Sequence, residues 1–452
     1  MTYRIEVDSL GEVNVPEEAM WGAQTERSRQ NFKIGKSIMP LSVIYGLVEI
    51  KRAAAIVNNS LGKLDQERQS AIVLACDEIL SGKWDDAFPL KVYQTGSGTQ
   101  SNMNCNEVIA RICQLKGVDV HPNDHVNMSQ SSNDTFPTAM HIAAYHSVTS
   151  RLLPELTEWL QVLEKLEQDN AGIIKIGRTH LQDATPLTFG QEISGWKTMI
   201  EKGHHFLVSN LKEIAFLTIG GTAVGTGLNA PEGFDIKMTA EINLHTKGSF
   251  ESEPNKFYGL TSHSELAMVH GIVRSLSADV MKIANDIRWL ASGPRAGLGE
   301  IIIPENEPGS SIMPGKVNPT QAEALTMVVC QVMGNDTTIQ VASSQGNFEL
   351  NVYKPVIINN FLESIELLTD GMSSFRRHCL EGIVPNKPEM ERKMTQSLML
   401  VTALSPHIGY EASATAATYA HAHDLELREA VIQLGLATEE EYTEWVVPEH
   451  MI

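Results

Sequence analysis

The sequence has 452 residues, of which 42% are hydrophobic and 20% charged, a composition that indicates a folded protein with a large core and excludes a disordered chain. It contains 55 acidic and 35 basic residues, which gives a formal charge of −20. Because nucleic acids and anionic membranes would both repel such a chain, we expect neither as a partner.

The five cysteines form no Cys-x-x-Cys pair, which argues against both a disulfide framework and a structural zinc site. The first residues lack the apolar stretch of a secretory signal, and no apolar run approaches the ~18 residues that span a bilayer. This pattern predicts a cytoplasmic protein, or one in an equivalent reducing compartment.

The N-terminal part is predicted to be mixed. Residues 3–15 alternate apolar and polar side chains around Leu10 and Gly11, which indicates a short hairpin, and residues 41–61 have the apolar spacing of a helix. Between residues 82 and 125 the composition shifts to Gly, Ser, Thr, Asn and Gln, which is typical of loops and helix starts.

Five long helices are predicted in the middle of the chain, because apolar residues recur there at alternating spacings of four and three. Gly293 and Pro294 would stop the third helix, and a smaller helical tail follows Pro388. Such near-heptad seams predict a bundle. The predicted helices cover residues 152–166, 189–214, 266–290, 321–341 and 359–380.

Four segments between the apolar stretches are too polar and rich in glycine to be packing. In the first, residues 95–107, Gly96 and Gly98 resemble the start of a dinucleotide loop, but Ser101 replaces the third glycine and repeated βαβ units are missing, which excludes a Rossmann site. Ser97, Thr99 and Asn102 offer hydroxyl and amide donors that suit a small anion. An N-capping loop is the alternative interpretation.

The second segment runs from residues 121–124 to residues 129–134. Ser131, Ser132 and Asn133 precede a helix, so backbone N–H groups and the helix dipole could hold a carboxylate there. Helix capping would explain one of these polar residues but not the whole run.

The third segment, residues 177–183, lies between two long helices and is expected to be irregular. It contains His180 beside Thr179 and Gln182. A lone histidine is more often structural than catalytic, but polar chemistry is usually found in irregular segments of this kind.

The fourth segment, residues 305–318, hints at a phosphate-binding P-loop. The glycine spacing is one residue too long, and Val317 stands where a hydroxyl residue would bind magnesium, so the nucleotide interpretation fails. A mobile Gly/Pro loop remains, with a serine that Lys316 and nearby donors could activate. Metal binding is not expected, since no His-Glu-x-x-His motif occurs and His421 and His423 would face different directions on a helix.

Together these four segments resemble the fumarase/aspartase superfamily, and within it the class II fumarase family. The run Gly309-Ser-Ser-Ile-Met-Pro-Gly-Lys-Val-Asn-Pro319 matches the superfamily signature. The likeness extends from Trp21 to Met451, and the segments that begin at Gly96 and Gly220 have the fumarase rather than the aspartase form.

The resemblance implies a mainly α, three-domain fold with a central five-helix bundle that joins three others in a twenty-helix tetramer core. We place a mixed, mostly helical domain at residues 1–130, the bundle at residues 131–387 and a small helical domain at residues 388–452. The implied activity is the reversible hydration of fumarate to L-malate, a hydro-lyase step of the tricarboxylic acid cycle. It would need no cofactor, in a cytoplasmic homotetramer whose active sites each combine residues of three subunits.

The resemblance also assigns residue roles. His180 and Ser310 form the catalytic pair, and Glu307 pairs with His180. Lys316 and Glu323 are further groups tied to catalysis. A second anion site maps onto His121, Pro122, Asn123 and Asp124, although Val118 and Asp119 stand where basic residues often precede this motif. Substrate binding is assigned to Ser97, Gly98, Thr99, Ser131, Ser132, Asn133, Thr179, Ser311, Lys316, Val317 and Asn318.

Two other functions are compatible with the sequence. Aspartate ammonia-lyase, or another succinyl-lyase of the superfamily, shares the carbanion step and would differ at few residues. A non-catalytic helical scaffold could use the same fold, but it would have no need to keep His180, Ser310 and Lys316 together.

Overall fold

The computed structural model describes residues 2–452, which form two compact units. The first unit contains the chain up to Pro154 together with His205–Ser275 and Cys330–Thr369, and the second contains Glu155–His204, Leu276–Val329 and Asp370–Ile452. Within residues 2–452 every sheet has only two strands, so the predicted mainly helical fold is confirmed. The domain limits at residues 130 and 387 stay a prediction.

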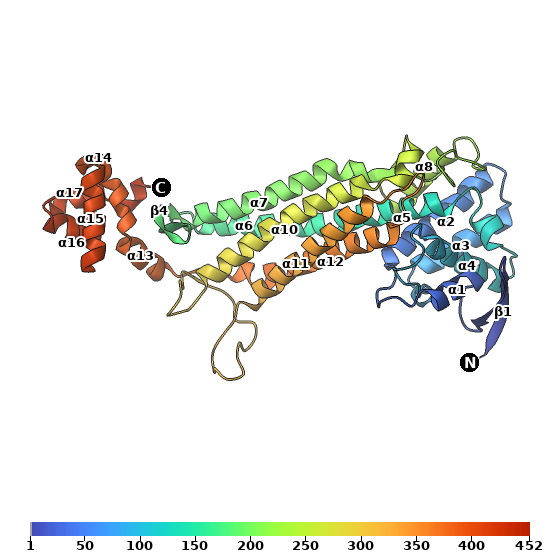
Figure 1. Ribbon diagram of the computed structural model, residues 1–452, viewed down its shortest axis with the longest axis horizontal. Helices are drawn as coiled ribbons and strands as arrows, with labels where there is room; N and C mark the ends of the chain where they lie inside the picture. Colours follow the sequence, from blue (N-terminus) through green and yellow to red (C-terminus); the bar gives the residue numbers. More distant parts are fainter. Residues whose placement is uncertain (1) are drawn as a thin grey trace. The chain divides into compact units, whose positions relative to one another are not determined.

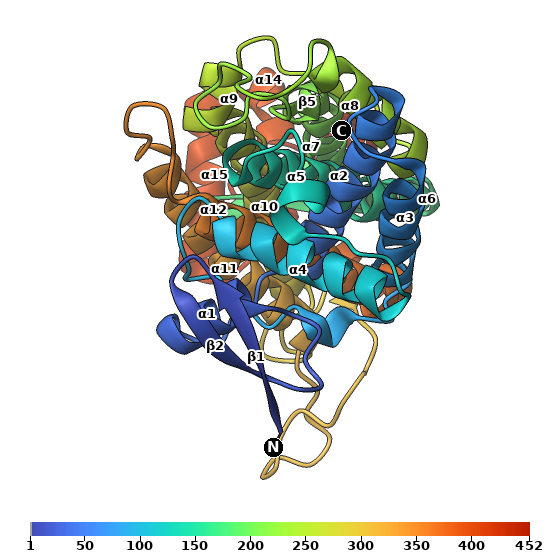
Figure 2. The same ribbon diagram turned by 90° about the vertical axis from the view of Figure 1, so that its right-hand side faces the viewer.

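The predicted N-terminal hairpin is present. Strands β1 (Tyr3–Asp8) and β2 (Gly11–Pro16) pair antiparallel, and the Asp8 carboxylate accepts a hydrogen bond from Leu10 N–H inside the turn. Figure 2 shows this hairpin beside α1 (Ala23–Asn31) and α4 (Thr99–Leu115), both of which belong to the same unit.

The core of the first unit is built around α2 (Leu41–Ser60), a helix with buried side chains on most of its surface. It packs closely on α5 (Ser132–Ser147). A Cβ placed on Gly46 would lie only 3.0 Å from the Ala139 carbonyl oxygen, which shows how closely the two helices approach. The other elements of this unit are α3 (Gln66–Leu80), α8 (Phe234–Thr246), α9 (Lys256–Thr261), β5 (Phe216–Leu217) and β6 (Glu251–Ser252).

The five predicted long helices are present and run side by side (Figure 1). The indole of Trp159 on the first of them donates to the Met372 carbonyl on the last, and Trp196 on the second donates to Asp286 on the third at 3.0 Å. The helices are α6 (Leu153–Asp169), α7 (Phe189–Asn210), α10 (Ser264–Leu290), α11 (Thr320–Ser343) and α12 (Lys354–His378).

Two helix limits differ from the sequence prediction by more than three residues. The second long helix ends at Asn210, because Leu211–Ala215 tightens into a 3₁₀ turn. The fifth begins at Lys354 rather than residue 359, since a proline such as Pro355 is tolerated in the first turn of a helix.

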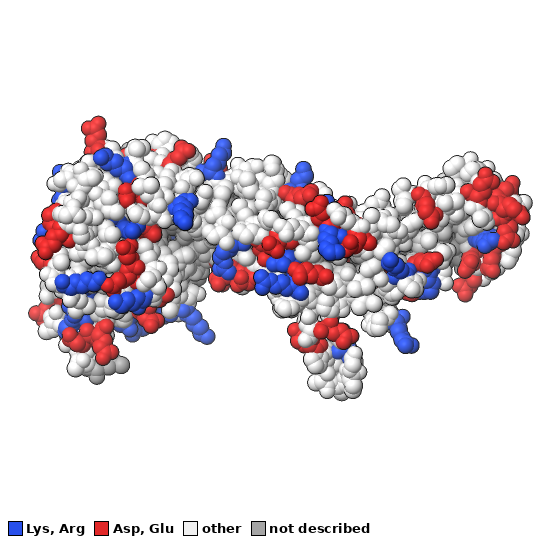
Figure 3. Space-filling model, turned by 180° about the vertical axis from the view of Figure 1, so that it is seen from behind, with Lys and Arg blue, Asp and Glu red and all other residues white. Residues whose placement is uncertain are grey.

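The C-terminal part of the second unit is a small helical cluster packed around Leu404, Leu427 and Val431, with His407 stacked on Trp445. Figure 3 shows acidic side chains gathered over these helices. Three of these side chains, Glu439, Glu440 and Glu441, lie in the first turn of the last helix, where the helix dipole favours negative charge. Other elements of the second unit are β7 (Ile301–Ile302), which pairs with β8 (Val384–Pro385), and the helices α13 (Lys387–Gln396), α14 (Ser405–Ile408), α15 (Tyr410–His423), α16 (Leu427–Gln433) and α17 (Glu439–Trp445). Among residues 2–452, no helix combines the length and the apolar character that crossing a membrane requires.

Candidate active site

The residues predicted for the active site are divided between the two units. The first unit holds those of residues 97–99, 121–124 and 131–133, and the second holds Thr179, His180 and the predicted residues between 307 and 323.

The turn before α4 is shaped by its glycines. A Cβ on Gly96 would overlap the Val352 carbonyl, and a Cβ on Gly98, whose φ is +77°, would overlap the Phe136 ring. The glycines therefore permit close packing of this turn against its own unit. The Ser97 and Thr99 hydroxyls lie 2.8 Å apart at the N-terminus of α4, where the helix dipole favours an anion, and the Ser101 N–H of this first turn donates to Gln94 Oε1.

The prediction that residues 95–107 are too polar for packing is wrong for Ser101–Glu107. These residues lie in α4, and their polar side chains are buried. The Glu107 carboxylate accepts hydrogen bonds from the N–H groups of Gly22, Gln24 and Thr25, and so caps the start of α1. Burial is tolerated where such groups find partners, as Asn104 Nδ2 does at the Ala87 carbonyl, whereas the Oδ1 atoms of Asn104 and Asn106 have none among residues 2–452.

The N-terminus of α5 has a capping box. The Ser131 hydroxyl accepts from Asn133 N–H, and the Asp134 carboxylate accepts from Ser131 N–H at 2.9 Å. The Ser132 hydroxyl accepts from the Asn102 amide at 2.9 Å, and the Asn133 amide donates to the Ala223 carbonyl. Capping thus accounts for Ser131, as the sequence analysis allowed for one residue of this run.

A cavity of about 490 Å³ opens beside this helix start. Its lining includes Gln130 and Ser131, and also Asn123 and Asp124 of the predicted second anion site. The His121 ring nitrogen Nδ1 accepts from Asp124 N–H at 3.2 Å, and both side chains are exposed. The structure therefore brings the two predicted anion-binding segments to one cavity of the first unit.

His180 lies at the tip of a β-hairpin, which corrects the expectation of an irregular segment. Strands β3 (Ile174–Thr179) and β4 (Gln182–Thr188) pair antiparallel with Thr179 opposite Gln182, so His180 and Leu181 form a two-residue turn. Their φ values of 56° and 61° are those of a type I′ turn, which normally favours Asn and Gly. The unfavourable residue types obscured the hairpin in the sequence.

The loop of residues 305–318 closes on itself near its base and stands away from the helices of its unit (Figure 1). Gly309 N–H donates to the Lys316 carbonyl at 2.7 Å, and the Asn318 amide donates to the Gly309 carbonyl at 2.6 Å. The Lys316 ammonium in turn donates to the Asn318 amide oxygen at 2.6 Å. Lysine and asparagine are thereby held together at the end of the loop.

Inside this loop, Ser310 Oγ accepts hydrogen bonds from the N–H groups of Ile312 and Met313, at 3.2 and 2.9 Å. Two N–H donors on one hydroxyl oxygen stabilise negative charge there. The sequence suggested that loop amides could act in this way but could not place them.

A cavity of about 840 Å³ lies against the loop, and four of the predicted residues line it, namely Lys316, Val317, Asn318 and Glu323. Arg288 of α10 lines the same cavity. Glu307 lies nearby in sequence but accepts a hydrogen bond from Thr320 at 2.7 Å, and within a single chain it forms no ion pair with His180.

Comparison with known proteins identifies the family. A family model described as lyase matches residues 11–334, and one described as fumarase C C-terminus matches residues 400–452. The chain is 57% identical to the fumarate hydratase class II of Staphylococcus epidermidis and of Bacillus subtilis, over 100% of this chain and 99% of each relative. It matches a crystal structure of class II fumarase from Schistosoma mansoni with a TM-score of 0.97 and 43% identity, covering 100% of this chain and 99% of that one.

The chain belongs to the class II fumarase family.

The buried Lys51 is a candidate functional residue that was not predicted from the sequence. Its side chain is fully buried and donates to the amide oxygens of Asn127 and Gln130, each at 2.9 Å. Burial lowers the pKa of Lys51 to about 7.

The amides around Lys51 extend this network to the start of α5. The Asn127 oxygen also accepts from the amides of Asn102 and Asn106, and Asn102 continues to Ser132. The available sequence signal for Lys51 was a charged group, Glu49 to Arg52, in the middle of a mostly apolar helix, since a buried charge there must be paired or functional. Arg288, which lines the cavity beside the loop, had no comparable signal in the sequence. For metals, residues 2–452 contain no group of three or more His, Cys, Asp or Glu side chains placed to hold an ion.

Proposed function

We propose that this protein catalyses the reversible hydration of fumarate to L-malate. The observation that carries the proposal is the 57% identity, over the whole chain, to proteins named fumarate hydratase class II. The loop that carries Ser310, Lys316 and Asn318 supplies groups that suit this chemistry.

In the dehydration direction, a proton must leave the carbon next to one carboxylate of malate, and the electron pair moves onto that carboxylate as an aci-carboxylate. Ser310 Oγ accepts this proton as an alkoxide. The hydrogen bonds from Ile312 and Met313 N–H support this role, because they stabilise negative charge on the oxygen before it reacts. The hydroxyl group then leaves the neighbouring carbon as water, with a proton from His180.

Charge that grows on the carboxylate needs a donor already in place. Lys316 and Asn318 meet this need because their side chains are held together by a 2.6 Å hydrogen bond and line one cavity. Ser97, Thr99 and residues 131–133 would bind the other carboxylate, and Glu307 would orient His180 across a subunit boundary. We also propose that Glu323 acts as a further acid and that residues 121–124 bind a second anion.

The chain is proposed to act as a homotetramer with composite active sites. The long helices carry apolar side chains that their own unit leaves exposed, including Trp289 on α10 and Met327 and Val341 on α11, which are 56%, 67% and 60% exposed. Apolar surface of this kind on packed helices favours contact between subunits.

A cytoplasmic location, with a role in the tricarboxylic acid cycle, is also proposed. The cysteines support a reducing compartment, because all five are free thiols and four of them are buried. Subcellular fractionation of the source cells, probed for this protein, tests the location.

Purified protein given L-malate should generate the ultraviolet absorbance of fumarate, with no added metal or cofactor. L-Aspartate is the control substrate. Deamination of aspartate without dehydration of malate would assign the protein to the ammonia-lyases, and a folded tetramer without either activity would leave the scaffold interpretation.

A further inference from the structure

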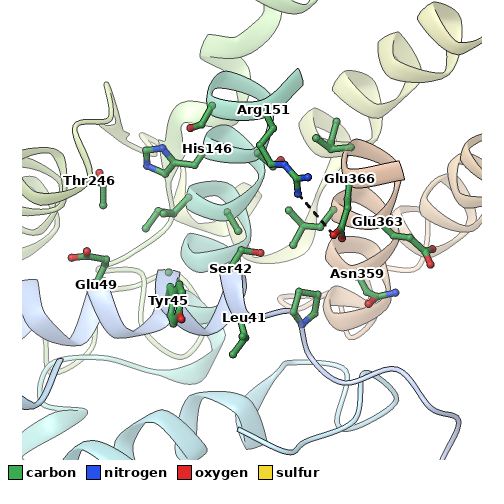
Figure 4. A pocket seen from close by; sticks show the side chains of 18 of the residues that line it. Leu41, Ser42, Tyr45, Glu49, His146, Arg151, Thr246, Asn359, Glu363 and Glu366 are labelled. Atoms are coloured by element: carbon green, nitrogen blue, oxygen red, sulfur yellow. Dashed lines mark ion pairs between the residues drawn. The ribbon is translucent and has the colours of Figure 1, made fainter. Parts of the chain in front are cut away.

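The first unit contains a second large cavity that the proposed reaction does not use. It has a volume of about 870 Å³ and lies between α2, α5 and α12, with Thr246 of α8 at one end (Figure 4). None of the residues predicted for the active site lines it. Its volume is in the range of pockets that hold small organic ligands.

The cavity combines apolar walls with polar ends. Leu41, Ile142, Leu362 and Ile365 contribute apolar surface from three helices. Polar side chains gather at two places, as Figure 4 shows: Glu49 and His146 near Thr246, and Arg151 near Glu366. An apolar body with a polar group at one end would fit such a lining.

The end with Glu49 and His146 lacks hydrogen-bond partners. Glu49 Oε2 and His146 Nε2 are both shielded from solvent, and neither has a partner among residues 2–452. A buried carboxylate oxygen without a donor is unfavourable, and such groups in folded proteins usually have a reason to be there. Burial raises the pKa of Glu49 despite the nearby positive charges of Arg52 and His245, and burial lowers the pKa of His146.

The sign of the charge around the cavity selects the ligand class. Three carboxylates, of Glu49, Glu363 and Glu366, line it against one guanidinium, that of Arg151, whose Nη1 lies 4.0 Å from a Glu366 oxygen. Dicarboxylates such as fumarate would be repelled, so the cavity is not a further substrate site.

We propose that this cavity binds a small organic cation with a flat apolar body, whose N–H groups donate to the Glu49 carboxylate. The apolar body would lie on Ile142 and Ile365, and Glu363 and Glu366 would add a favourable potential. The inference does not depend on the proposed hydratase activity, because it rests on a different cavity and on different residues.

Three probes of nearly the same shape but different charge test the proposal on the full-length assembled protein: benzamidine, benzamide and benzoate. Binding is measured by saturation-transfer NMR and isothermal titration. We expect benzamidine to bind with a dissociation constant of about 1 mM or lower, neutral benzamide more weakly, and benzoate not measurably. Equal binding of all three, or no binding of benzamidine because a second copy covers the cavity, would overturn the proposal.

Two Glu→Gln variants, one in the cavity and one outside it, test where benzamidine binds. Glu49→Gln keeps the shape of the side chain, and we expect it to weaken benzamidine binding by about tenfold or more, the loss of one charge-assisted hydrogen bond. Glu67→Gln, an exposed residue of α3 outside the cavity, should leave binding unchanged. Both variants should dehydrate malate at the wild-type rate, which confirms folding; unchanged benzamidine binding by folded Glu49→Gln would contradict the assignment.

Discussion

At the level of single residues, His180 occupies a left-handed backbone position, with a φ of 56°, which makes asparagine the most informative replacement. Asparagine adopts this conformation more readily than most residues, so His180→Asn should keep the hairpin and the melting temperature. Because the proton transfer to the leaving hydroxyl is lost, kcat for malate should fall by about 10²–10⁴-fold. Steady-state kinetics and thermal unfolding measure the two effects.

The neighbouring turn residue offers a matched control. Leu181→Asn introduces the same side chain at the adjacent left-handed position and should leave kcat within about twofold of the wild type, because the leucine has no proton to exchange. If both variants lost activity equally, the geometry of the turn rather than the imidazole would be responsible.

Ser310 and Lys316 should differ in how they affect catalysis. Ser310→Ala removes only the group that acts on carbon, so kcat should fall strongly while KM stays nearly constant. Lys316→Met keeps the apolar stem but removes the charge that meets both the substrate and the growing negative charge, so kcat should fall and KM should rise. A raised KM with unchanged kcat in Ser310→Ala would make Ser310 a binding residue.

Lys51 should contribute to substrate affinity from beneath the surface. At pH 6, below its pKa of about 7, Lys51 is an ammonium behind Asn127 and Gln130, which line the cavity at the start of α5, and it adds positive potential there. We expect Lys51→Met to raise KM for malate by about tenfold at this pH, while Lys36→Met, an exposed lysine of the same unit, has no effect. An unchanged KM in a folded Lys51→Met protein would show that the lysine is structural only.

The same lysine should make stability depend on pH. Its pKa falls from 10.5 to about 7 on folding, because burial disfavours the charged form. Between these values the unfolded chain binds the proton and the folded chain does not, so the free energy of unfolding should rise with pH, by up to about 1.4 kcal/mol per unit. Urea unfolding from pH 7 to 10 should show a shallower rise for Lys51→Met than for the wild type.

At the level of secondary-structure elements, the hairpin of β3 and β4 holds His180 at the cost of two unfavourable backbone positions. On β3, Lys175 and Arg178 both pair with the buried Glu300 carboxylate, which fixes the strand below the turn. Leu181 is 68% exposed and has little packing to lose. We therefore expect Leu181→Gly to stabilise the protein by about 1 kcal/mol, since glycine adopts a positive φ without steric penalty.

The matched comparison is Leu181→Val, because a β-branched side chain is the least compatible with a left-handed backbone. It should lower the melting temperature, whereas Leu181→Gly should raise it. Differential scanning calorimetry of both proteins provides the measurement, and the same ranking should hold whether or not His180 is present. Equal melting temperatures would mean that the turn relaxes to another conformation in solution.

The elements that the sequence predicted well are those with a local signal. The N-terminal hairpin and the five long helices follow from alternation and from near-heptad spacing, which require no knowledge of the partner. The start of α4 could not be predicted in this way, because the buried amides of Asn102 and Asn106 are satisfied by Asn127, more than twenty residues along the chain. For the same reason the sequence could not show that Gly96 packs against Val352.

The signature loop shows the same limit within the candidate site. Its residue types indicated a serine, a lysine and a mobile loop, and the structure adds the two N–H donors to Ser310 Oγ and the hydrogen bond from Lys316 to Asn318. Such contacts depend on backbone geometry, which residue types alone do not specify. The residue roles came from the resemblance to the family, and they remain predictions for mutagenesis.

At the level of the whole molecule, a single chain leaves much of the proposed site open. Thr179, His180 and Lys316 are all exposed, although proton transfer at carbon requires a site that excludes water. The proposed homotetramer resolves this, because segments of other subunits would cover these residues. Light scattering should therefore give the mass of four chains, and a monomer mass at working concentration would contradict the proposal.

Mixing of inactive variants tests the composite site directly. His180→Asn and Lys316→Met should each be nearly inactive alone, but each still contributes the residue that the other lacks. Suppose that the two residues of one site come from different subunits and that chains exchange at random in a 1:1 mixture. One half of the sites then have an intact His180, and one half of those also have an intact Lys316. About one quarter of the wild-type activity should therefore return. Activity should appear only after the subunits have been dissociated and reassembled together, and not when preformed tetramers are mixed. If each site were built within one chain, no combination of subunits would restore it, and the mixture would stay as inactive as its parts.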